Sequence, residues 1–304
     1  MFRRVLAAVD FSDASAEAAR LAWWLTDDDG ELRVIYVDEI PDPATLSHEP
    51  QYVTRHAWQV LRAKHAAEFG RNLDKLVAQL SAGADERAGP RVSPAVCTGE
   101  VVETICQEAR GQAELIVIGA HGESGSVRFL FGSVAAKVSR HAPAPVLVTR
   151  PGRVDRLRHR RFERVVVAID HSPFSEAAVR LARQVTALGS TVTLLHVWQP
   201  PASLAIGLTG ERRVFEVGRM QQLVDSLGID SEDVELMVEV GSPAAKILEY
   251  AEESEADLVV VGAHSRANMV EKIVGTTADR VLRHAKMPVL LIPKELLASA
   301  AQPA

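Results

Sequence analysis

The sequence predicts two tandem α/β domains, each built on a doubly wound parallel sheet with helices on both faces. Apolar segments that resemble strands alternate with helix-like segments along the whole chain, which is typical of parallel sheets buried on both sides. The pattern also occurs twice, because the segment from Phe2 to Ser15 returns, with the same spacing of Asp and Ser, from Phe162 to Ser175. Two copies of this length predict two domains rather than a solenoid.

The repeat also sets the expected domain boundaries. Each copy closes on an Arg-His pair followed by Pro-Val-Leu, first from Arg140 and again from Arg283. The expected organisation is a first domain at 1–150, an Arg-rich linker at 151–160, a second domain at 161–294 and a flexible tail at 295–304. The linker could contact an anionic partner, but its place at a domain junction favours a solvated tether.

The composition excludes several classes of protein. A chain of 304 residues with 47% hydrophobic residues can bury two separate cores. A net charge of −6 argues against a nucleic-acid-binding surface. No apolar run is long enough to span a membrane, and no signal-peptide core follows the first residues, so a cytoplasmic protein is expected. The spacing of Cys97 and Cys106 matches neither a redox pair nor a zinc knuckle.

The elements follow from apolar periodicity and turn signals. In the first copy, a helix capped by Ser12 or Asp13 is expected after the first strand, and further helices at about 51–81, 101–110 and 133–141. The apolar positions of the long helix recur at helical spacing and are Val60, Leu61, Leu73, Leu76 and Leu80. Five strands are expected in each copy, at 4–9, 32–37, 92–97, 115–118 and 146–149, and at 165–169, 192–197, 234–240, 258–261 and 289–292.

A glycine motif follows the fourth predicted strand of the first copy: Gly119-x-x-Gly122, nine further residues, then Gly132-Ser133. Gly119 would let the chain turn sharply, and Gly122 would permit a positive φ angle or the close passage of a phosphate. Gly132 and Ser133 open a helix whose unpaired N–H groups and positive dipole end attract anions. The motif therefore predicts a loop that holds the phosphates of a nucleotide.

Two further residues point to the same crevice. If the strand order is 3-2-1-4-5, the order reverses between strands 1 and 4, whose carboxyl ends carry Asp10 and Gly119, and ligands bind at such reversals. The carboxylate of Asp10 suits a ribose hydroxyl or, through a metal ion, a phosphate, although Asp10 could instead simply cap the following helix. Val37 ends the second strand, where backbone groups could contact a purine edge.

These residues resemble the universal stress protein family in its tandem two-domain form. The resemblance rests on the glycine motif, on Asp-x-Ser after the first strand and on the closing His-Ala-x-x-Pro-Val-Leu-Val pattern, and it covers nearly the whole chain. It implies five-stranded sheets of order 3-2-1-4-5, an adenine nucleotide as ligand, and pairing of the two domains through their fifth strands. It assigns Asp10 and Val37 to adenosine. It assigns the phosphates to Gly119, Gly122, Gly132, Ser133 and the backbone of Val134.

The second copy departs from this motif at one position. Its counterpart residues are Asp170, Val197, Gly262, Ser265, Gly275 and Thr276. Ser265 replaces the middle glycine, and a left-handed backbone there would cost a non-glycine residue roughly 1–2 kcal/mol, or about tenfold in affinity. We therefore expect weaker binding in the second domain, with a purely structural second domain as the alternative.

The expected function is that of an ATP-binding regulatory module in stress adaptation, with slow hydrolysis at most and no catalytic residues. ADP or AMP could replace ATP, and Mg²⁺ could accompany ATP near Asp10, but the protein alone offers no predicted metal site. No Walker A lysine and no Gly-x-Gly-x-x-Gly after the first strand are found. Two alternative functions stay open, an ATP-consuming enzyme related to adenylyl transferases and a nucleotide-free scaffold. Assembly of the whole chain into a homodimer also stays open. The protein partner cannot be read from the residues.

Overall fold

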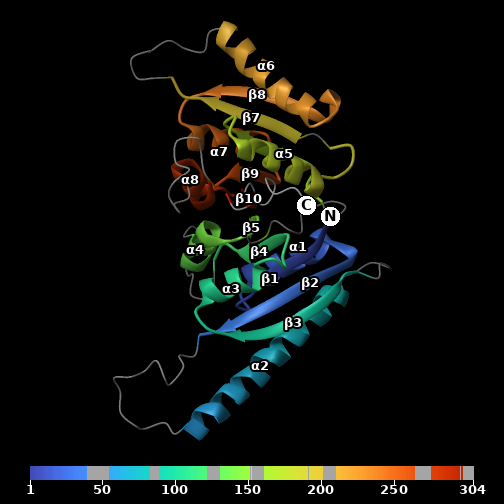
Figure 1. The fold of residues 1–304 in the computed structure, drawn as a ribbon, viewed down its shortest axis with the longest axis vertical. Coiled ribbons are helices and arrows are strands. Elements are labelled where there is room, and N and C mark those ends of the chain that lie inside the picture. Colours follow the sequence, from blue (N-terminus) through green and yellow to red (C-terminus); the bar gives the residue numbers. More distant parts are fainter. Residues whose placement is uncertain are drawn as a thin grey trace.

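Figure 1 shows the fold in a computed structural model of the chain. The structure describes residues 1–39, 55–82, 89–121, 131–150, 152, 161–190, 192–200, 210–263, 275–294 and 296. Two predicted site residues, Gly122 and Ser265, lie outside these ranges, as do nearly all of the Arg-rich linker and the tail.

Strands and helices alternate through both halves of the chain. Domain 1 contains β1 (Phe2–Ala8), α1 (Asp13–Leu25), β2 (Thr26–Asp38), α2 (Arg55–Ala82), β3 (Arg91–Thr98), α3 (Val101–Ala109), β4 (Leu115–Gly119), α4 (Ser133–His141) and β5 (Val146–Thr149). Domain 2 contains β6 (Val165–Ile169), α5 (Pro173–Val185), β7 (Val192–Trp198), α6 (Gly210–Ser226), a 3₁₀ turn (Ser231–Asp233), β8 (Val234–Val240), α7 (Pro243–Glu253), β9 (Leu258–Gly262), α8 (Thr276–His284) and β10 (Val289–Ile292). The predicted tandem α/β fold is confirmed.

The strands form one ten-stranded sheet of order β3-β2-β1-β4-β5-β10-β9-β6-β7-β8. Each half therefore has the order 3-2-1-4-5, and all neighbouring strands within a half are parallel. The halves meet where β10 pairs antiparallel with β5, with Leu290 opposite Leu147. The pairing through fifth strands that the resemblance implies is thus present within this chain, in the centre of Figure 1.

Two layers of helices cover the sheet, and each layer has its own core. On one face, α1, α2, α5 and α6 bury side chains such as Leu21, Leu73 and Val179. On the other face, α3, α4, α7 and α8 bury side chains such as Ile105 and Val281. Because both faces are covered, the central strands β4, β6, β9 and β10 read as continuous apolar runs rather than as alternating ones, whereas the outer strands β2, β3 and β8 include polar residues. Among the described residues, no helix combines the length and the apolarity that crossing a bilayer requires.

Two elements differ from the sequence-based expectations, and for α1 the structure selects one of the two expected caps. The N-cap of α1 is Ser12, whose side chain accepts from the backbone N–H of Ser15, so that Asp13 is the first helical residue. β2 begins at Thr26, several residues before the predicted start, because its polar first half still pairs with β1. Val60 was expected on the apolar side of the long helix, but its side chain is 54% exposed. That end of α2 extends beyond the edge of the sheet in Figure 1.

One buried cation joins the two domains. Arg150 follows β5, is only 8% exposed, and donates through Nη2 to the carbonyl oxygen of Leu282 in the last turn of α8. Its guanidinium carbon lies 5.8 Å from the ring centroid of Phe131. Burial lowers the pKa of Arg150 to about 10, so that the side chain still carries its charge at pH 7. A cation at a helix C-terminus is favoured by the helix dipole.

The change Arg150→Met, which keeps the length of the side chain and removes its donors, should destabilise the domain junction. A hydrogen bond to a charged group contributes about 1.5–3 kcal/mol, and the midpoint of denaturant-induced unfolding should fall accordingly. The control is Arg180→Met, which removes an exposed pair with Glu176 and should cost less than about 1 kcal/mol. Equal shifts in the two variants would mean that Arg150 does not stabilise the junction.

Candidate functional site

A pocket of about 290 Å³ lies at the carboxyl ends of β1, β2 and β4 in domain 1. Its lining also includes the start of α4 and residues of α3. This is the crevice at which the strand order reverses, between β1 and β4. Its volume is close to the lower end of the range of about 300–1,000 Å³ that is typical of ligand sites.

The structure brings the described site residues of domain 1 together around this pocket. The six lining residues that the sequence analysis names are Asp10, Val37, Gly119, Gly132, Ser133 and Val134. They come from four separate segments of the chain, and only the fold places them around one volume. Their contact with a nucleotide stays a prediction.

Asp10 sits in a tight turn just after β1. Its Oδ1 atom accepts from the backbone N–H of Ser12 over 3.1 Å and from the Ser12 hydroxyl over 2.6 Å. Phe11, between them, has a φ of 66°, which is rare for a residue with a side chain. Strained backbone of this kind is held in place by its surroundings and gathers at functional sites. Ser12, and not Asp10, is the N-cap of α1. Asp10 holds the Ser12 side chain in position.

Gly119 has a role that the sequence analysis did not predict. A Cβ atom at this position would lie 3.0–3.1 Å from backbone atoms of Ala14 and Ser15 at the start of α1. The backbone of Gly119 does not have a positive φ, so its glycine is required by close packing and not by a left-handed turn. Gly119 therefore lets the end of β4 approach the start of α1. The β1 side and the β4 side of the crevice thus lie close together.

The N-terminus of α4 is open toward an anion. The N–H of Gly132 donates to the carbonyl oxygen of Ala120 over 2.8 Å, which closes the loop back onto the end of β4. Among the residues that the structure describes, no side chain caps the next amides, from Ser133 to Ala135, in contrast to α1, whose first turn is capped by Ser12. Uncapped amides and a positive dipole end form a site for phosphate groups.

The lining residues that were not assigned a role from the sequence include Ser15 and His121. Ser15 lines the pocket, and its hydroxyl accepts from the backbone N–H of Asp10 over 3.2 Å. The repeated spacing Asp-x-Ser-x-x-Ser was a signal that could have identified it. His121 also lines the pocket, and among the described residues its buried Nε2 atom has no hydrogen-bond partner. Burial, together with the charge of Arg150, lowers the pKa of His121, which makes the ring neutral at pH 7.

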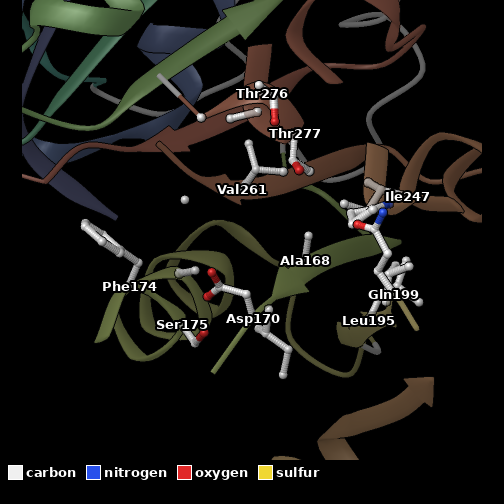
Figure 2. Close-up of a pocket in the computed structure, with 17 residues that line it drawn as sticks. Ala168, Asp170, Phe174, Ser175, Leu195, Gln199, Ile247, Val261, Thr276 and Thr277 are labelled. Atoms are coloured by element: carbon white, nitrogen blue, oxygen red, sulfur yellow. The ribbon is translucent and has the colours of Figure 1, made fainter. Parts of the chain in front are cut away.

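Domain 2 holds a matching pocket of about 330 Å³, shown in Figure 2. The predicted residues that line it are Asp170, Val197, Gly262, Gly275 and Thr276. The loop closes as in domain 1, because the N–H of Gly275 donates to the carbonyl oxygen of Ala263 over 2.7 Å. Within the described part of the chain, α8 likewise has no side-chain cap.

The two pockets differ in a few side chains. Phe174 lines the second pocket at the position that Ala14 holds in the first domain, and Gln199 replaces Glu39. Figure 2 shows Phe174 and Asp170 on the side of the pocket opposite Thr276. The second pocket is therefore intact among the described residues, but its lining is not the same.

A family model described as the universal stress protein family matches the chain twice, over residues 1–150 and 161–293. A universal stress protein of Mycolicibacterium smegmatis is 29% identical over 290 residues, which cover 92% of this chain and 94% of the relative. A universal stress protein of Mycobacterium tuberculosis is 26% identical over 288 residues, which cover 92% of this chain and 94% of the relative.

Solved structures show the same fold. The crystal structure of a universal stress protein from Archaeoglobus fulgidus matches with a TM-score of 0.66 at 21% identity, covering 95% of this chain and 98% of the other. A putative universal stress protein from Pseudomonas aeruginosa also matches with a TM-score of 0.66, at 18% identity, covering 98% of this chain and 96% of the other. At these identities the likeness extends to the fold alone.

Proposed function

Because the chain belongs to the universal stress protein family, we propose that it binds an adenine nucleotide, ATP above all, in the pocket of domain 1. In this proposal the protein is a nucleotide-dependent regulatory module in stress adaptation. The observation that carries the proposal is the crevice between β1 and β4, where an acidic residue faces the uncapped N-terminus of α4 across one pocket. A carboxylate for the ribose and free amides for the phosphates are the two groups that a nucleotide requires.

The lining suggests how the nucleotide would lie. Apolar side chains of Ile35, Val101 and Ile105 would contact the faces of the adenine ring, next to the end of β2 at Val37. Asp10 would accept from the ribose hydroxyls. The phosphates would then point toward Gly132 and the amides that follow it, and a Mg²⁺ ion bound with ATP would lie on the side of Asp10.

We propose a weaker second site in domain 2. The pocket there keeps Asp170 and the uncapped start of α8, which supports binding. Ser265 in place of the middle glycine opposes it, at a cost of roughly tenfold in affinity if that residue needs a left-handed backbone. The tandem chain would thus carry one tight site and one weak site.

The change Asp10→Ala tests the assignment in domain 1. Loss of a hydrogen bond to a charged group costs about 1.5–3 kcal/mol, so that the affinity of the tight site for ATP should fall roughly 10- to 150-fold by titration calorimetry. Asp170→Ala is the matched control, because it makes the same change in domain 2 and should leave the tight site unaltered. If both variants bind ATP as the parent protein does, the pockets do not hold ribose in this way.

A further inference from the structure

Three ionisable side chains meet on the face of the domain 2 sheet that lies opposite the pocket. His171 follows β6, His196 lies on β7 and Glu216 lies on α6, and one ligand atom from each falls within 4.8 Å of the other two. The neighbours of His196 on β7 line the pocket, so that His196 itself points to the other face. Glu216 is 1% exposed, which makes it an unusually buried carboxylate.

The same place in domain 1 is filled by aromatic rings. Phe11 is the counterpart of His171 and Tyr36 that of His196, each 160 positions earlier in the chain. The ring centroids of Phe11 and Tyr36 lie 4.9 Å apart, and that of Phe69 on α2 lies 4.2 Å from Tyr36. The turn itself is the same, because φ is 66° at Phe11 and 58° at His171. Domain 2 thus has two imidazoles and a carboxylate where domain 1 has packed aromatic rings. Burying these polar groups costs free energy.

The hydrogen bonds orient both imidazoles toward Glu216. The Nδ1 atom of His196 lies 2.9 Å from the carbonyl oxygen of Ile169, so that it carries the proton and leaves a lone pair on Nε2. That Nε2 lies 3.8 Å from Oε2 of Glu216, and Nε2 of His171 lies 3.0 Å from the same oxygen. Ligands held at about 2.0–2.2 Å from a tetrahedral metal ion lie about 3.3–3.5 Å from one another, within the range seen here.

The surroundings of Glu216 match those of a ligating carboxylate. Its Oε1 is paired with Arg212, whose guanidinium lies over the rings of Trp198 and Phe215, at 5.5 and 5.2 Å. The other carboxylate oxygen of Glu216, Oε2, then faces the two histidines. A partner such as Arg212, which contacts the ligand and not the metal, orients a metal-binding side chain. Arg219 approaches Oε2 at 3.7 Å, but its side chain is 32% exposed and can turn to solvent when a cation enters.

In the metal-free protein, Nε2 of His171 donates to Glu216. A metal ion would take the lone pair of that nitrogen once the ring proton has moved to Nδ1, with no net change in protonation.

We propose that His171, His196 and Glu216 form a zinc site that fastens α6 to the sheet of domain 2, with a water molecule as the fourth ligand. Two imidazoles and one carboxylate are a ligand set that zinc accepts, whereas Mg²⁺ and Ca²⁺ prefer oxygen alone. This site is independent of the nucleotide pocket. The sequence analysis expected no metal site formed by the protein alone. The three residues lie far apart in the sequence, on separate elements, so that their spacing gives no signal of a site.

The test uses the full chain, stripped with a chelator, incubated with zinc, dialysed and assayed for metal by mass spectrometry. About one tightly held zinc ion per chain is expected, together with a higher unfolding temperature than that of the stripped protein. The double variant H171F/H196Y introduces the residues of domain 1 and should hold none. His141→Ala removes an exposed histidine and should leave uptake unchanged, which controls for zinc bound elsewhere on the surface.

A second measurement needs no variant. Cobalt added to the stripped protein should give the intense visible absorption of a four-coordinate site, and zinc should displace it. Absence of zinc uptake, equal uptake by a folded H171F/H196Y variant, or only the weak spectrum of hydrated cobalt would each overturn the proposal. The cluster would then be an ionic network of Glu216 with its arginines and histidines.

Discussion

Replacing Ala8 with tryptophan is expected to abolish nucleotide binding in domain 1 while the protein stays folded. Ala8 ends β1 and lines the pocket, between the segments that carry Ile35 and Ile118. An indole ring at this position would fill the part of the pocket in which the nucleotide is proposed to bind. We expect the affinity of the tight site to fall at least about 100-fold, or about 2.7 kcal/mol, in titration calorimetry.

Ala168 provides the matched control, because it lines the second pocket at the corresponding position, as Figure 2 shows. Ala168→Trp should remove only the weak binding event and leave the tight one. Circular dichroism would show that both variants keep their secondary structure. Tight binding that survives Ala8→Trp would place the nucleotide outside this pocket.

Replacing Leu147 with aspartate should unfold the junction between the two domains. Leu147 is 1% exposed and lies opposite Leu290 where β5 pairs with β10. An unpaired carboxylate buried at this point would cost about 3–5 kcal/mol, which is a large share of the stability of a typical domain. The midpoint of denaturant unfolding should fall, and the unfolding of the two halves should become separable.

The control is the same substitution at Leu188, whose side chain is fully exposed. Leu188→Asp should change stability by no more than about 0.5 kcal/mol. If Leu147→Asp proves as harmless as Leu188→Asp, the domains do not depend on the shared strand pairing for their stability.

The sequence predicted most of the fold because the central strands of each half are short, apolar and bounded by turn residues. The limits of β5, β6, β8 and β10 agree with the expected ranges. The strands β5, β6 and β10 are buried and leave a continuous apolar signal, whereas β8 is an edge strand that carries Glu235 and Glu239. The polar first half of β2 and the exposed end of α2 were mispredicted. The start of β2 depends on its pairing with β1, and the exposure of the end of α2 depends on where the sheet ends. Local periodicity encodes neither.

The site was predicted through repetition rather than through periodicity. Gly119 and Gly132 recur with equal spacing in both copies, Asp10 recurs within the same Asp-x-Ser-x-x-Ser pattern, and the topology then brings them to one crevice. The packing of Gly119 against α1 could not be predicted, because it is a contact between distant segments. The same holds for His171 and Glu216, which meet only when α6 packs on the sheet.

The most direct test of the nucleotide proposal is the stoichiometry of binding. The purified protein would be heat-extracted and its nucleotide content determined by chromatography, and the stripped protein would then be titrated calorimetrically with ATP and magnesium. We predict one tight ATP per chain and a second event about tenfold weaker, as expected if Ser265 weakens domain 2. No extracted nucleotide and no heat on adding ATP with magnesium would contradict the proposal and favour a nucleotide-free scaffold.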